Sequence, residues 1–525
     1  MKNFFISIFL LTGLLASLSS KGQAIFQTKK AKSWADSVLL DMSIDEKIGQ
    51  LFMVSAYSNL GEAHTSEVLD QIKKYHVGGL IFFQGGPVRQ AHLTNLYQSK
   101  SELPLMIGMD AEWGLSMRLD STYAFPWNMT LGAIKNNDLV EKVGRQVGEH
   151  CKRLGVHFNF APVVDINTNP KNPIIGVRSF GEQKEVVASH SLAFMEGMQS
   201  SGVMANAKHF PGHGDTDSDS HKTLPTISFS NARIDSLELY PYKSLFSKGL
   251  SSVMVAHLNV PSLDDRLNYP SSLSYPIVTD LLQKKLGFDG LIFTDALDMK
   301  GVSNFSDPGE VDLQAFLAGN DVMLMSLDVS QGISTLLKAV KSGVISKKRL
   351  ARSVKKILDA KYKVGLANYK PTASNNLLAD LNRQKDNVLY QSLMENAITL
   401  VQNKNNLLPL KNLDLCKIAY VNMGTADASP FVKTLKKYKG KLIEVTFDKN
   451  ISSTEIKNKI IKFGITSNNR VSRLKRLMNA KGIVRILESH NSLTGLIIES
   501  ILEKCIVHNL YIPLYLELIQ EVAML

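Results

Sequence analysis

The loop at residues 208–221 concentrates side chains that can transfer protons or bind metal ions. It holds three histidines and three aspartates and directly follows an apolar segment. So many titratable groups on one loop favour a reactive site over a solvated surface loop. Metal-binding histidines on a helix face are commonly spaced at i and i+4, but Pro211 and Gly212 interrupt any helix between His209 and His213. This spacing makes the two histidines poor ligands of a helical metal motif.

The elements that would position this loop are near-continuous apolar segments, which recur along residues 49–326. Such segments are typical of parallel strands covered on both faces, and the intervals between them leave room for connecting helices. Eight strand–helix units predict an α/β protein with a TIM-like (β/α)8 barrel. The predicted strands are residues 49–55, 77–83, 103–109, 156–164, 203–207, 252–256, 290–294 and 321–326.

Polar residues fall at or just past the ends of these predicted strands. In a parallel barrel the carboxyl ends of all strands lie on one face, and that face holds the active site in enzymes of this architecture. The sequence therefore predicts that side chains far apart in the chain meet there. They are Asp110, Asp165, Lys208, His209, His257 and Asp295.

Helix signals lie around the predicted strands. Ser43 and Glu46 have the spacing of a capping box just before the first strand. Apolar periodicity predicts helices at residues 137–153 and 230–248. A further helical stretch at 347–366 closes the barrel.

A second domain is expected after the barrel, which would span residues 25–366. The polar segment 367–386 is typical of a linker. Residues 387–464 then predict the start of a second α/β domain of the sandwich type. Beyond about residue 464 the alternation fades, so the tail 465–525 is atypical, as a truncation or frameshift in the gene would make it. The predicted elements of the second domain are a helix at 387–397 and strands at 398–402 and 416–422.

Residues 1–24 have the pattern of an export signal, with Lys2 followed by an apolar run at 4–18 and then small residues. The apolar run is short for a membrane span. We therefore expect a periplasmic or secreted bacterial protein with no stable membrane insertion once the signal is removed. The three cysteines are too few and too scattered for a disulfide framework.

The positive charge does not surround the candidate site. The formal net charge is +12, but most of it falls in residues 401–525. A nucleic-acid-binding protein needs a basic surface around its working face, and the sequence carries no nucleic-acid-binding motif. We therefore expect no nucleic-acid partner.

Six segments occur in an order and spacing that resemble glycoside hydrolase family 3, in particular its bacterial β-N-acetylglucosaminidase branch. They are Met109-Asp-Ala-Glu-Trp-Gly114, Phe160-Ala-Pro-Val-Val-Asp165, Asn172-Pro-Ile-Ile-Gly-Val-Arg-Ser-Phe-Gly181, Lys208-His-Phe-Pro-Gly-His-Gly214, Asp219-Ser-His221 and Thr294-Asp-Ala-Leu-Asp-Met299. The resemblance extends over about residues 35–420 and implies a TIM-like barrel. It implies an exo-acting, retaining β-N-acetylglucosaminidase that hydrolyses terminal N-acetylglucosamine from peptidoglycan fragments or related amino-sugar glycosides, without cofactor or metal.

The resemblance also implies residue roles. Retaining cleavage needs a carboxylate nucleophile on one side of the anomeric carbon and an acid/base group on the other. Asp295 matches the nucleophile of the family, and His221 with Asp219 matches its acid/base pair. An imidazole can donate a proton to the leaving oxygen and later accept one from water, while the neighbouring carboxylate orients the ring. Implied sugar-binding residues are Asp110, Arg178, Lys208 and His209.

Other functions remain open at the level of the sequence. A β-glucosidase or β-xylosidase of the same family would take a Glu from a later domain as its acid/base. Phosphate could attack the glycosyl-enzyme, because a histidine leaves no permanent anion there, so a glycoside phosphorylase is a second alternative. A metal-dependent hydrolase using His209, His213 and His221 and a non-catalytic sugar-binding module are the alternatives from other classes.

Several residues also have structural interpretations. Arg178 could pair with Asp165, and His213 is expected to support the shape of its loop rather than to touch sugar. Trp113 and Trp127 could stack on a sugar ring, although aromatic residues at such spacing more often belong to the core. Trp113 also stands where the family commonly has glycine, which changes the rim beside Asp110.

Overall fold

The structure, a computed structural model, describes residues 29–220, 222–401, 403, 408–410, 417–424, 430–438, 443–448 and 483–489. They fall into two compact units, and the boundary along the chain lies between Ala397 and Ile398. The expected export signal and most of the expected tail lie outside the described residues. Within the described part of the chain, no helix has the length and apolar character needed to cross a membrane.

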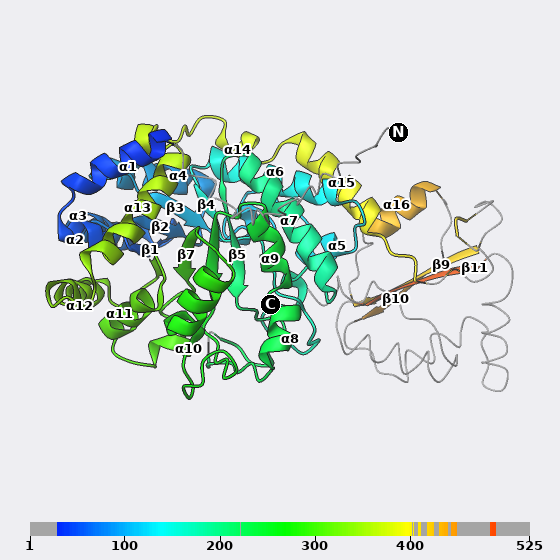
Figure 1. The fold of residues 1–525 in the computed structure, drawn as a ribbon. Helices are drawn as coiled ribbons and strands as arrows, with labels where there is room; N and C mark the ends of the chain where they lie inside the picture. Colours follow the sequence, from blue (N-terminus) through cyan, green and yellow to red (C-terminus); the bar gives the residue numbers. More distant parts are fainter. Residues whose placement is uncertain are drawn as a thin grey trace, which may run out of the picture. The chain divides into compact units, whose positions relative to one another are not determined.

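The first unit contains the predicted barrel of parallel strands (Figure 1). The hydrogen-bonded order is β7-β6-β5-β4-β3-β2-β1-β8, so β8 returns to lie beside β1. A parallel bridge between Phe293 and Val322 brings the β7 and β8 ends of the sheet together. All eight strands overlap the predicted segments: β1 (Phe52–Ala56), β2 (Gly79–Phe82), β3 (Met106–Met109), β4 (Phe158–Asn159), β5 (Met204–Phe210), β6 (Ser252–Val255), β7 (Leu291–Thr294) and β8 (Met323–Leu324).

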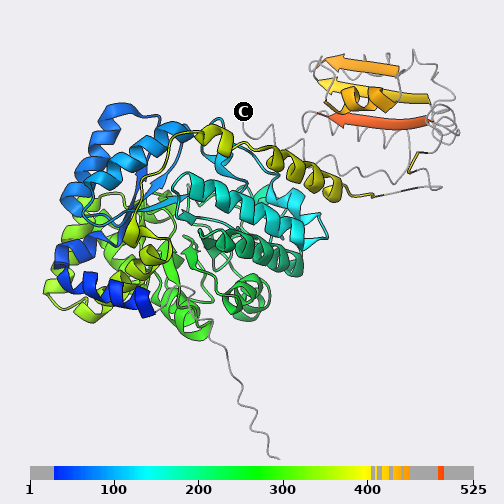
Figure 2. The same ribbon diagram turned by 90° about the horizontal axis from the view of Figure 1, so that it is seen from above.

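Helices cover the outside of the barrel (Figure 2). The predicted capping box is present: Glu46 N donates to Ser43 Oγ, and Ser43 N donates to the Glu46 carboxylate. It opens α2 just before β1. The helices of the first unit include α1 (Lys29–Asp41), α2 (Ile44–Gly49), α3 (Gly61–Tyr75), α4 (Pro87–Lys100), α5 (Asn128–Gly132), α6 (Asn137–Arg153), α7 (Lys184–Ser200), α8 (Asn231–Ser236), α9 (Tyr240–Ser247), η4 (Pro276–Lys285), α10 (Lys300–Ser303), α11 (Pro308–Ala318), α12 (Val329–Lys341) and α13 (Lys347–Lys363).

The barrel interior is filled with side chains. Strands β2, β3, β6 and β7 are buried at every position, which explains why they appear in the sequence as continuous apolar runs. Phe158 and Phe160 both pack on Phe293, with ring centroids 4.8 and 5.4 Å from it. This packed interior leaves the two ends of the barrel as its working surfaces.

One predicted helix is divided. The prediction of a continuous helix at 230–248 is wrong, because the segment forms α8 and then α9. Pro241 is in the first turn of α9. Proline has no N–H to donate and its ring clashes with the carbonyl of residue i−4, so a helix cannot pass through this position undisturbed.

The expected linker 367–386 is part of the first unit. It contains α14 (Leu377–Asp380) and the start of α15 (Gln384–Ala397). Leu381 and Asp386 are fully buried. Asp386 lies 3.2 Å from His150 of α6, and Arg153 of α6 donates to Asp380 at 2.7 Å. These contacts hold the segment on the barrel, so the compact unit ends at Ala397 and not at residue 366.

The second unit contains a three-stranded parallel sheet in the order β10-β9-β11. Strand β9 agrees with the strand predicted at 416–422, whose first residue lies outside the described residues. The strand predicted at 398–402 is wrong for 398–401, which pair with no described strand and leave Ile398 79% exposed. Strand β11, in the tail, was not predicted. The elements are β9 (Lys417–Gly424), α16 (Pro430–Tyr438), β10 (Ile443–Asp448) and β11 (Ile483–Ser489).

Candidate active site

The predicted polar residues lie at the carboxyl ends of the strands. Asp110 directly follows β3, and Asp295 directly follows β7. Lys208 and His209 lie near the end of β5, where its pairing with β6 shifts register between Ala207 and Phe210. Because all eight strands are parallel, these residues share one face of the barrel, as the sequence predicts.

A chain of alternating charges crosses this face between β3 and β5. Asp110 accepts from Lys208 Nζ at 2.7 Å and from Arg118 Nη2 at 2.5 Å. Lys208 Nζ also lies 2.8 Å from Glu112 Oε1. Arg178 binds the Glu112 carboxylate with two nitrogens, Nε at 3.0 Å and Nη2 at 2.7 Å. Two carboxylates therefore hold three cations in fixed positions, and the fork geometry of Arg178 fixes its orientation as well.

The cations keep both carboxylates ionised. Burial alone would raise the pKa of Asp110, but Lys208 and Arg118 outweigh it, so the pKa lies well below its usual range. Burial would also raise the pKa of Glu112, but Arg178 and Lys208 lower it to about 2. Burial would lower the pKa of Arg178, but the attraction of the Glu112 carboxylate is stronger and raises it. Asp110, Glu112 and Arg178 are thus charged at neutral pH.

A second carboxylate hub lies beside this network. Asp165 Oδ2 is 2.7 Å from His209 Nδ1, and Asp165 Oδ1 accepts from His213 N at 2.7 Å. Burial would raise the pKa of Asp165, but the neighbouring His209 outweighs it and the pKa is lowered. His209 Nε2 lies 3.4 Å from Arg178 Nη2, which connects the two networks.

Two residues of this site were missed in the sequence. Glu112 is the partner of Arg178, so the alternative pairing of Arg178 with Asp165 is wrong. A signal existed, because side chains two residues apart in extended chain point the same way and Glu112 is two residues after Asp110. Arg118 was missed because it follows the short helix η1 (Leu115–Met117), which no local pattern predicts to return to Asp110.

Asp295 is half-buried just after β7. Its N–H donates to Val255 O at 2.8 Å, and its Oδ1 accepts from Ala296 N at 2.9 Å. It does not cap the following helix, α10, whose N-cap is Met299. His257, after β6, is 2.9 Å from Ala296 O through Nε2 and 2.7 Å from Ser272 Oγ through Nδ1. His257 therefore supports the backbone next to Asp295.

The two members of the expected acid/base pair are described unequally. Asp219 is half-buried on the loop after β5, with its carboxylate 3.8 Å from Lys222 Nζ. Its carbonyl accepts from Lys222 N and Thr223 N at 3.0 and 2.9 Å. His221 lies outside the described residues. The pairing of Asp219 with His221 stays a prediction.

The two tryptophans stack on each other. The rings of Trp113 and Trp127 lie 4.5 Å apart at an interplanar angle of 5°. Both are half-buried. Each covers one face of the other, so they form a joint aromatic element beside Glu112 that is neither pure core nor a pair of free sugar platforms.

The ring nitrogens of the two described histidines of the predicted loop contact other side chains of the protein. His213 Nδ1 lies 2.7 Å from Thr216 Oγ1 and its Nε2 lies 3.0 Å from Ser220 Oγ. His209 contacts Asp165 on one side and the Arg178 cation on the other. A positive neighbour disfavours a metal ion at His209. This arrangement argues against a metal centre built from His209 and His213.

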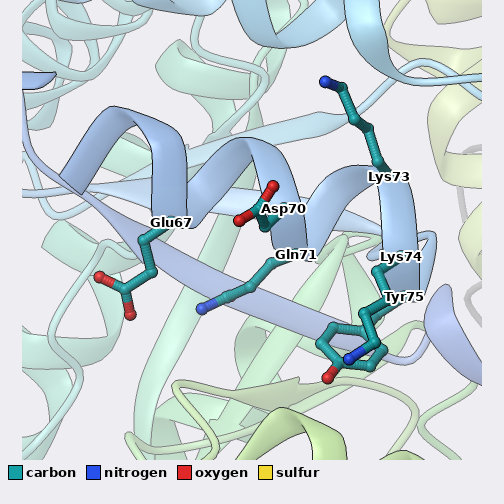
Figure 3. Close-up of a pocket in the computed structure, with 6 residues that line it drawn as sticks. All are labelled: Glu67, Asp70, Gln71, Lys73, Lys74 and Tyr75. Carbon is teal, nitrogen blue, oxygen red and sulfur yellow. The ribbon is translucent and has the colours of Figure 1, made fainter. Parts of the chain in front are cut away.

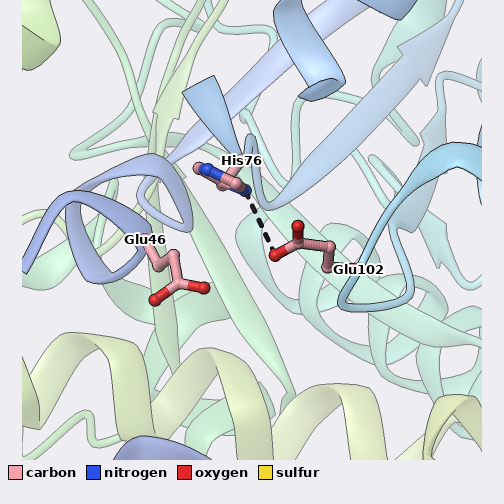
Figure 4. Close-up of side chains that lie close together, drawn as sticks. All are labelled: Glu46, His76 and Glu102. Atoms are coloured by element: carbon pink, nitrogen blue, oxygen red, sulfur yellow. Dashed lines mark ion pairs between the residues drawn. The ribbon is translucent and has the colours of Figure 1, made fainter. Parts of the chain in front are cut away.

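Other polar groups lie at the opposite end of the barrel. Glu46, His76 and Glu102 precede β1, β2 and β3, so they belong to the amino-terminal face, and their potential ligand atoms lie within 4.8 Å of one another (Figure 4). Glu46 is already the capping-box carboxylate, and His76 pairs with Glu102 at 3.7 Å. A surface depression along α3 is lined by Glu67, Asp70, Gln71, Lys73, Lys74 and Tyr75 (Figure 3). Neither feature includes a predicted site residue.

Comparison with known proteins agrees with this fold. Residues 43–360 match the glycosyl hydrolase family 3 N-terminal domain, and the chain belongs to that family. It is 33% identical over 378 residues to β-hexosaminidase A of Pseudoalteromonas piscicida, covering 66% of this chain and 62% of that protein. It is 28% identical over 390 residues to a β-N-acetylglucosaminidase/β-glucosidase of Cellulomonas fimi, covering 72% of this chain and 68% of that protein.

A solved structure shares most of the architecture. It is a family 3 β-N-acetylglucosaminidase from Paenibacillus sp. str. FPU-7, with a TM-score of 0.69 and 29% identity. The likeness covers 89% of this chain and 88% of that one. The family resemblance and the TIM-like barrel predicted from the sequence are confirmed.

Proposed function

We propose that the protein is an exo-acting, retaining β-N-acetylglucosaminidase. The observation that carries this proposal is the juxtaposition on one barrel face of Asp295 with the network of Asp110, Glu112, Lys208 and Arg178. Sugars carry many hydroxyl groups, and fixed charged donors and acceptors recognise them with directional hydrogen bonds. Relatives named as β-hexosaminidases support the N-acetylhexosamine specificity.

The proposed reaction has two steps, formation of a glycosyl-enzyme and its hydrolysis. A carboxylate oxygen of Asp295 attacks the anomeric carbon while the bond to the leaving oxygen breaks, and His221 gives its proton to that oxygen. Water then attacks the glycosyl-enzyme, its proton returns to His221, and the Asp295 carboxylate is released. Asp219 would hold the imidazole and favour its charged form. Two inversions leave the product with the anomeric configuration of the substrate.

The sugar-binding roles go to Asp110, Lys208, Arg178 and His209. Buried partners preorganise these side chains, so binding a sugar needs little rearrangement of protein dipoles. Lys208 is 2% exposed and Asp110 is 8% exposed, which gives their hydrogen bonds a setting of low dielectric. Such bonds discriminate strongly between a sugar that makes them and one that does not.

A substrate class and a cellular location are also part of the proposal. We propose terminal β-linked N-acetylglucosamine on peptidoglycan fragments or related amino-sugar glycosides as substrate. The export pattern of residues 1–24 supports a periplasmic or secreted location, where such fragments arise. A test is the distribution of activity between periplasmic, medium and cytoplasmic fractions of the native organism.

The test of the reaction is turnover of matched aryl glycosides. We expect the aryl β-N-acetylglucosaminide to be hydrolysed far faster than the aryl β-glucoside, and NMR at early times to show the β-anomer first. A preference for the β-glucoside would support the family's glucosidase activity, which the name of the Cellulomonas fimi relative also carries. An α-anomer as first product would contradict retention. Formation of a sugar phosphate in phosphate buffer would identify a phosphorylase.

A further inference from the structure

We propose that His213 is a positioning residue, whose ring fixes Ser220 and thereby the peptide that carries Asp219. This inference rests on the proposed function, because Ser220 is the residue between Asp219 and His221. His213 would not touch the sugar. It would set where Asp219, the described member of the acid/base pair, stands on its loop.

The contact is buried and specific. His213 Nε2 lies 3.0 Å from Ser220 Oγ, and Nδ1 lies 2.7 Å from Thr216 Oγ1. His213 is 1% exposed, and both hydroxyl residues are 2% exposed. A single ring thus ties two points of the loop, one on each nitrogen. Breaking either bond would leave buried polar atoms without a partner, which the fold disfavours.

The hydrogen bonds also define the protonation of the ring. Burial, together with the neighbouring His209, lowers the pKa of His213 to about 4, so the ring is neutral near pH 7 and has one N–H. Thr216 uses its hydroxyl hydrogen toward His213 O at 3.1 Å, so Thr216 Oγ1 accepts from Nδ1–H. Nε2 is then the acceptor, and the Ser220 hydroxyl donates to it.

The backbone of His213 is anchored to the sugar-binding side. Asp165 takes the His213 N–H on Oδ1 and the His209 ring on Oδ2. Asn172 Nδ2 donates to His213 O at 2.8 Å. One carboxylate therefore places both a sugar-binding side chain and the anchor of the acid/base loop.

Ser220 is enclosed from the other side by the helix that follows the nucleophile. A Cβ on Gly301, in α10, would lie 2.8 Å from Ser220 O and from Thr223 O. Only glycine allows this approach. Ser220 is therefore held between His213, at the end of β5, and α10, which follows Asp295 closely in the chain. The contacts with His213 and with α10 together set the separation between the loop and the strand that carries the nucleophile.

The test uses the two amide isosteres of histidine in the full-length protein. An asparagine amide stands near the Nδ1 position of histidine and a glutamine amide near the Nε2 position. His213→Asn therefore keeps the Thr216 bond and loses the Ser220 bond, whereas His213→Gln does the reverse. Ser220→Ala removes the same bond from the other side, and Thr216→Val is the matched control for the opposite nitrogen.

The readout is kcat/KM on an unactivated alkyl and an activated dinitrophenyl β-N-acetylglucosaminide. We expect His213→Asn and Ser220→Ala to lose on the order of ten- to a hundredfold on the alkyl glycoside, because a displaced acid donates poorly. Their loss on the dinitrophenyl glycoside should be small. His213→Gln and Thr216→Val should keep the wild-type ratio of the two substrates. The double variant His213→Asn, Ser220→Ala should lose no more than either single variant.

Three outcomes would overturn the proposal: equal losses on both substrates, equal losses for the asparagine and glutamine variants, or an unchanged ratio in Ser220→Ala. Thermal melting of each variant checks that the fold is intact. Failure of the proposed function is distinguishable, because it would appear as wild-type turnover by Asp295→Asn or as an unchanged leaving-group dependence in His221→Ala. If those two variants behave as expected while Ser220→Ala does not, only the role of His213 is lost.

Discussion

The two sides of the barrel mouth hold their carboxylates differently. Between β3 and β5, Asp110 and Glu112 are buried, and each contacts two cations. Beyond β5, Asp295 and Asp219 are half-buried, and Asp295 accepts from the backbone N–H of Ala296. A carboxylate that is held by two cations is a fixed binding group, whereas a nucleophile has to direct an oxygen lone pair at carbon. This contrast is the one expected if, as proposed, Asp110 belongs to the sugar-binding network and Asp295 is the nucleophile.

The largest effect is expected at Asp295. Asp295→Asn keeps the shape of the side chain but removes the charge needed for the covalent intermediate. We expect a loss of turnover on the order of 10⁵-fold, comparable with removal of the nucleophile in other covalent enzymes. Steady-state kinetics with an aryl β-N-acetylglucosaminide measures it, and an unchanged melting temperature is the control. Turnover near that of wild type would move the nucleophile elsewhere on the face.

The next effect is expected at His221. His221→Ala should reduce kcat/KM for glycosides with poor leaving groups by about 10²–10⁴-fold, the usual contribution of a general acid. Activated nitrophenyl glycosides should lose much less, because their leaving group departs without a proton. Asp219→Asn should shift the pH profile of kcat/KM, since it removes the charge that favours imidazolium. Equal losses on both substrate types would assign His221 a structural role.

A smaller and different effect is expected on the binding side. Glu112→Gln leaves Arg178 and Lys208 buried without their shared anion, which should cost about 3–5 kcal/mol in the free energy of unfolding. KM should rise, because the two cations no longer have fixed positions. Glu141→Gln is the matched control, since Glu141 pairs with Arg145 at 2.6 Å on the surface, and its loss should stay within about 0.5 kcal/mol.

The pH dependence of this variant sharpens the comparison. The pKa of Glu112 is lowered to about 2, so its ion pairs stabilise the fold above the usual carboxyl pKa and are lost as the pH falls toward 2. Glu112→Gln removes this contribution at every pH. Urea unfolding between about pH 5 and about pH 3 should therefore show a shallower acid loss in the variant than in wild type. Parallel curves would mean that Glu112 is not the carboxylate that the cations stabilise.

The barrel was predictable from the sequence because its strands are buried on both faces. Such strands have continuous apolar runs, and the polar residue that ends each run marks the carboxyl end. The partners in the charge network were not predictable to the same degree. Glu112 and Arg178 are far apart in the chain, and only the closed barrel brings their loops together.

One of the other differences has a local signal, and two depend on contacts between distant residues. Pro241 is visible in the sequence and explains the break between α8 and α9. The packing of residues 367–386 depends on buried contacts such as that of Asp386 with His150, which polar loop composition hides. Strand β11 pairs with β9 over a long interval of chain, and pairing at that range leaves no local pattern.

The smallest effect on turnover is expected at Asp312, a buried carboxylate on α11 that pairs with no cation among the described residues, unlike Asp110 and Glu112. Ser326 Oγ donates to its Oδ2 at 2.7 Å, and its Oδ1 has no hydrogen-bond partner among the described residues. Burial raises the pKa of Asp312 to about 8. A raised pKa means that the protonated carboxyl stabilises the fold at low pH and that this stability is lost as the pH rises through about 8.

Asp312→Asn is neutral at every pH and keeps the shape and the acceptor for Ser326. We therefore expect the free energy of unfolding of wild type to fall relative to that of the variant as the pH rises from about 5 to about 8. Ser326→Ala should extend the fall to higher pH, since the Ser326 hydroxyl is the group that lowers the pKa against burial. Urea unfolding at several pH values, continued above about pH 8, measures both pH dependences. Equal slopes in wild type and Asp312→Asn would show that Asp312 is ionised in the fold, and burial without a cation would then not separate this carboxylate from Asp110.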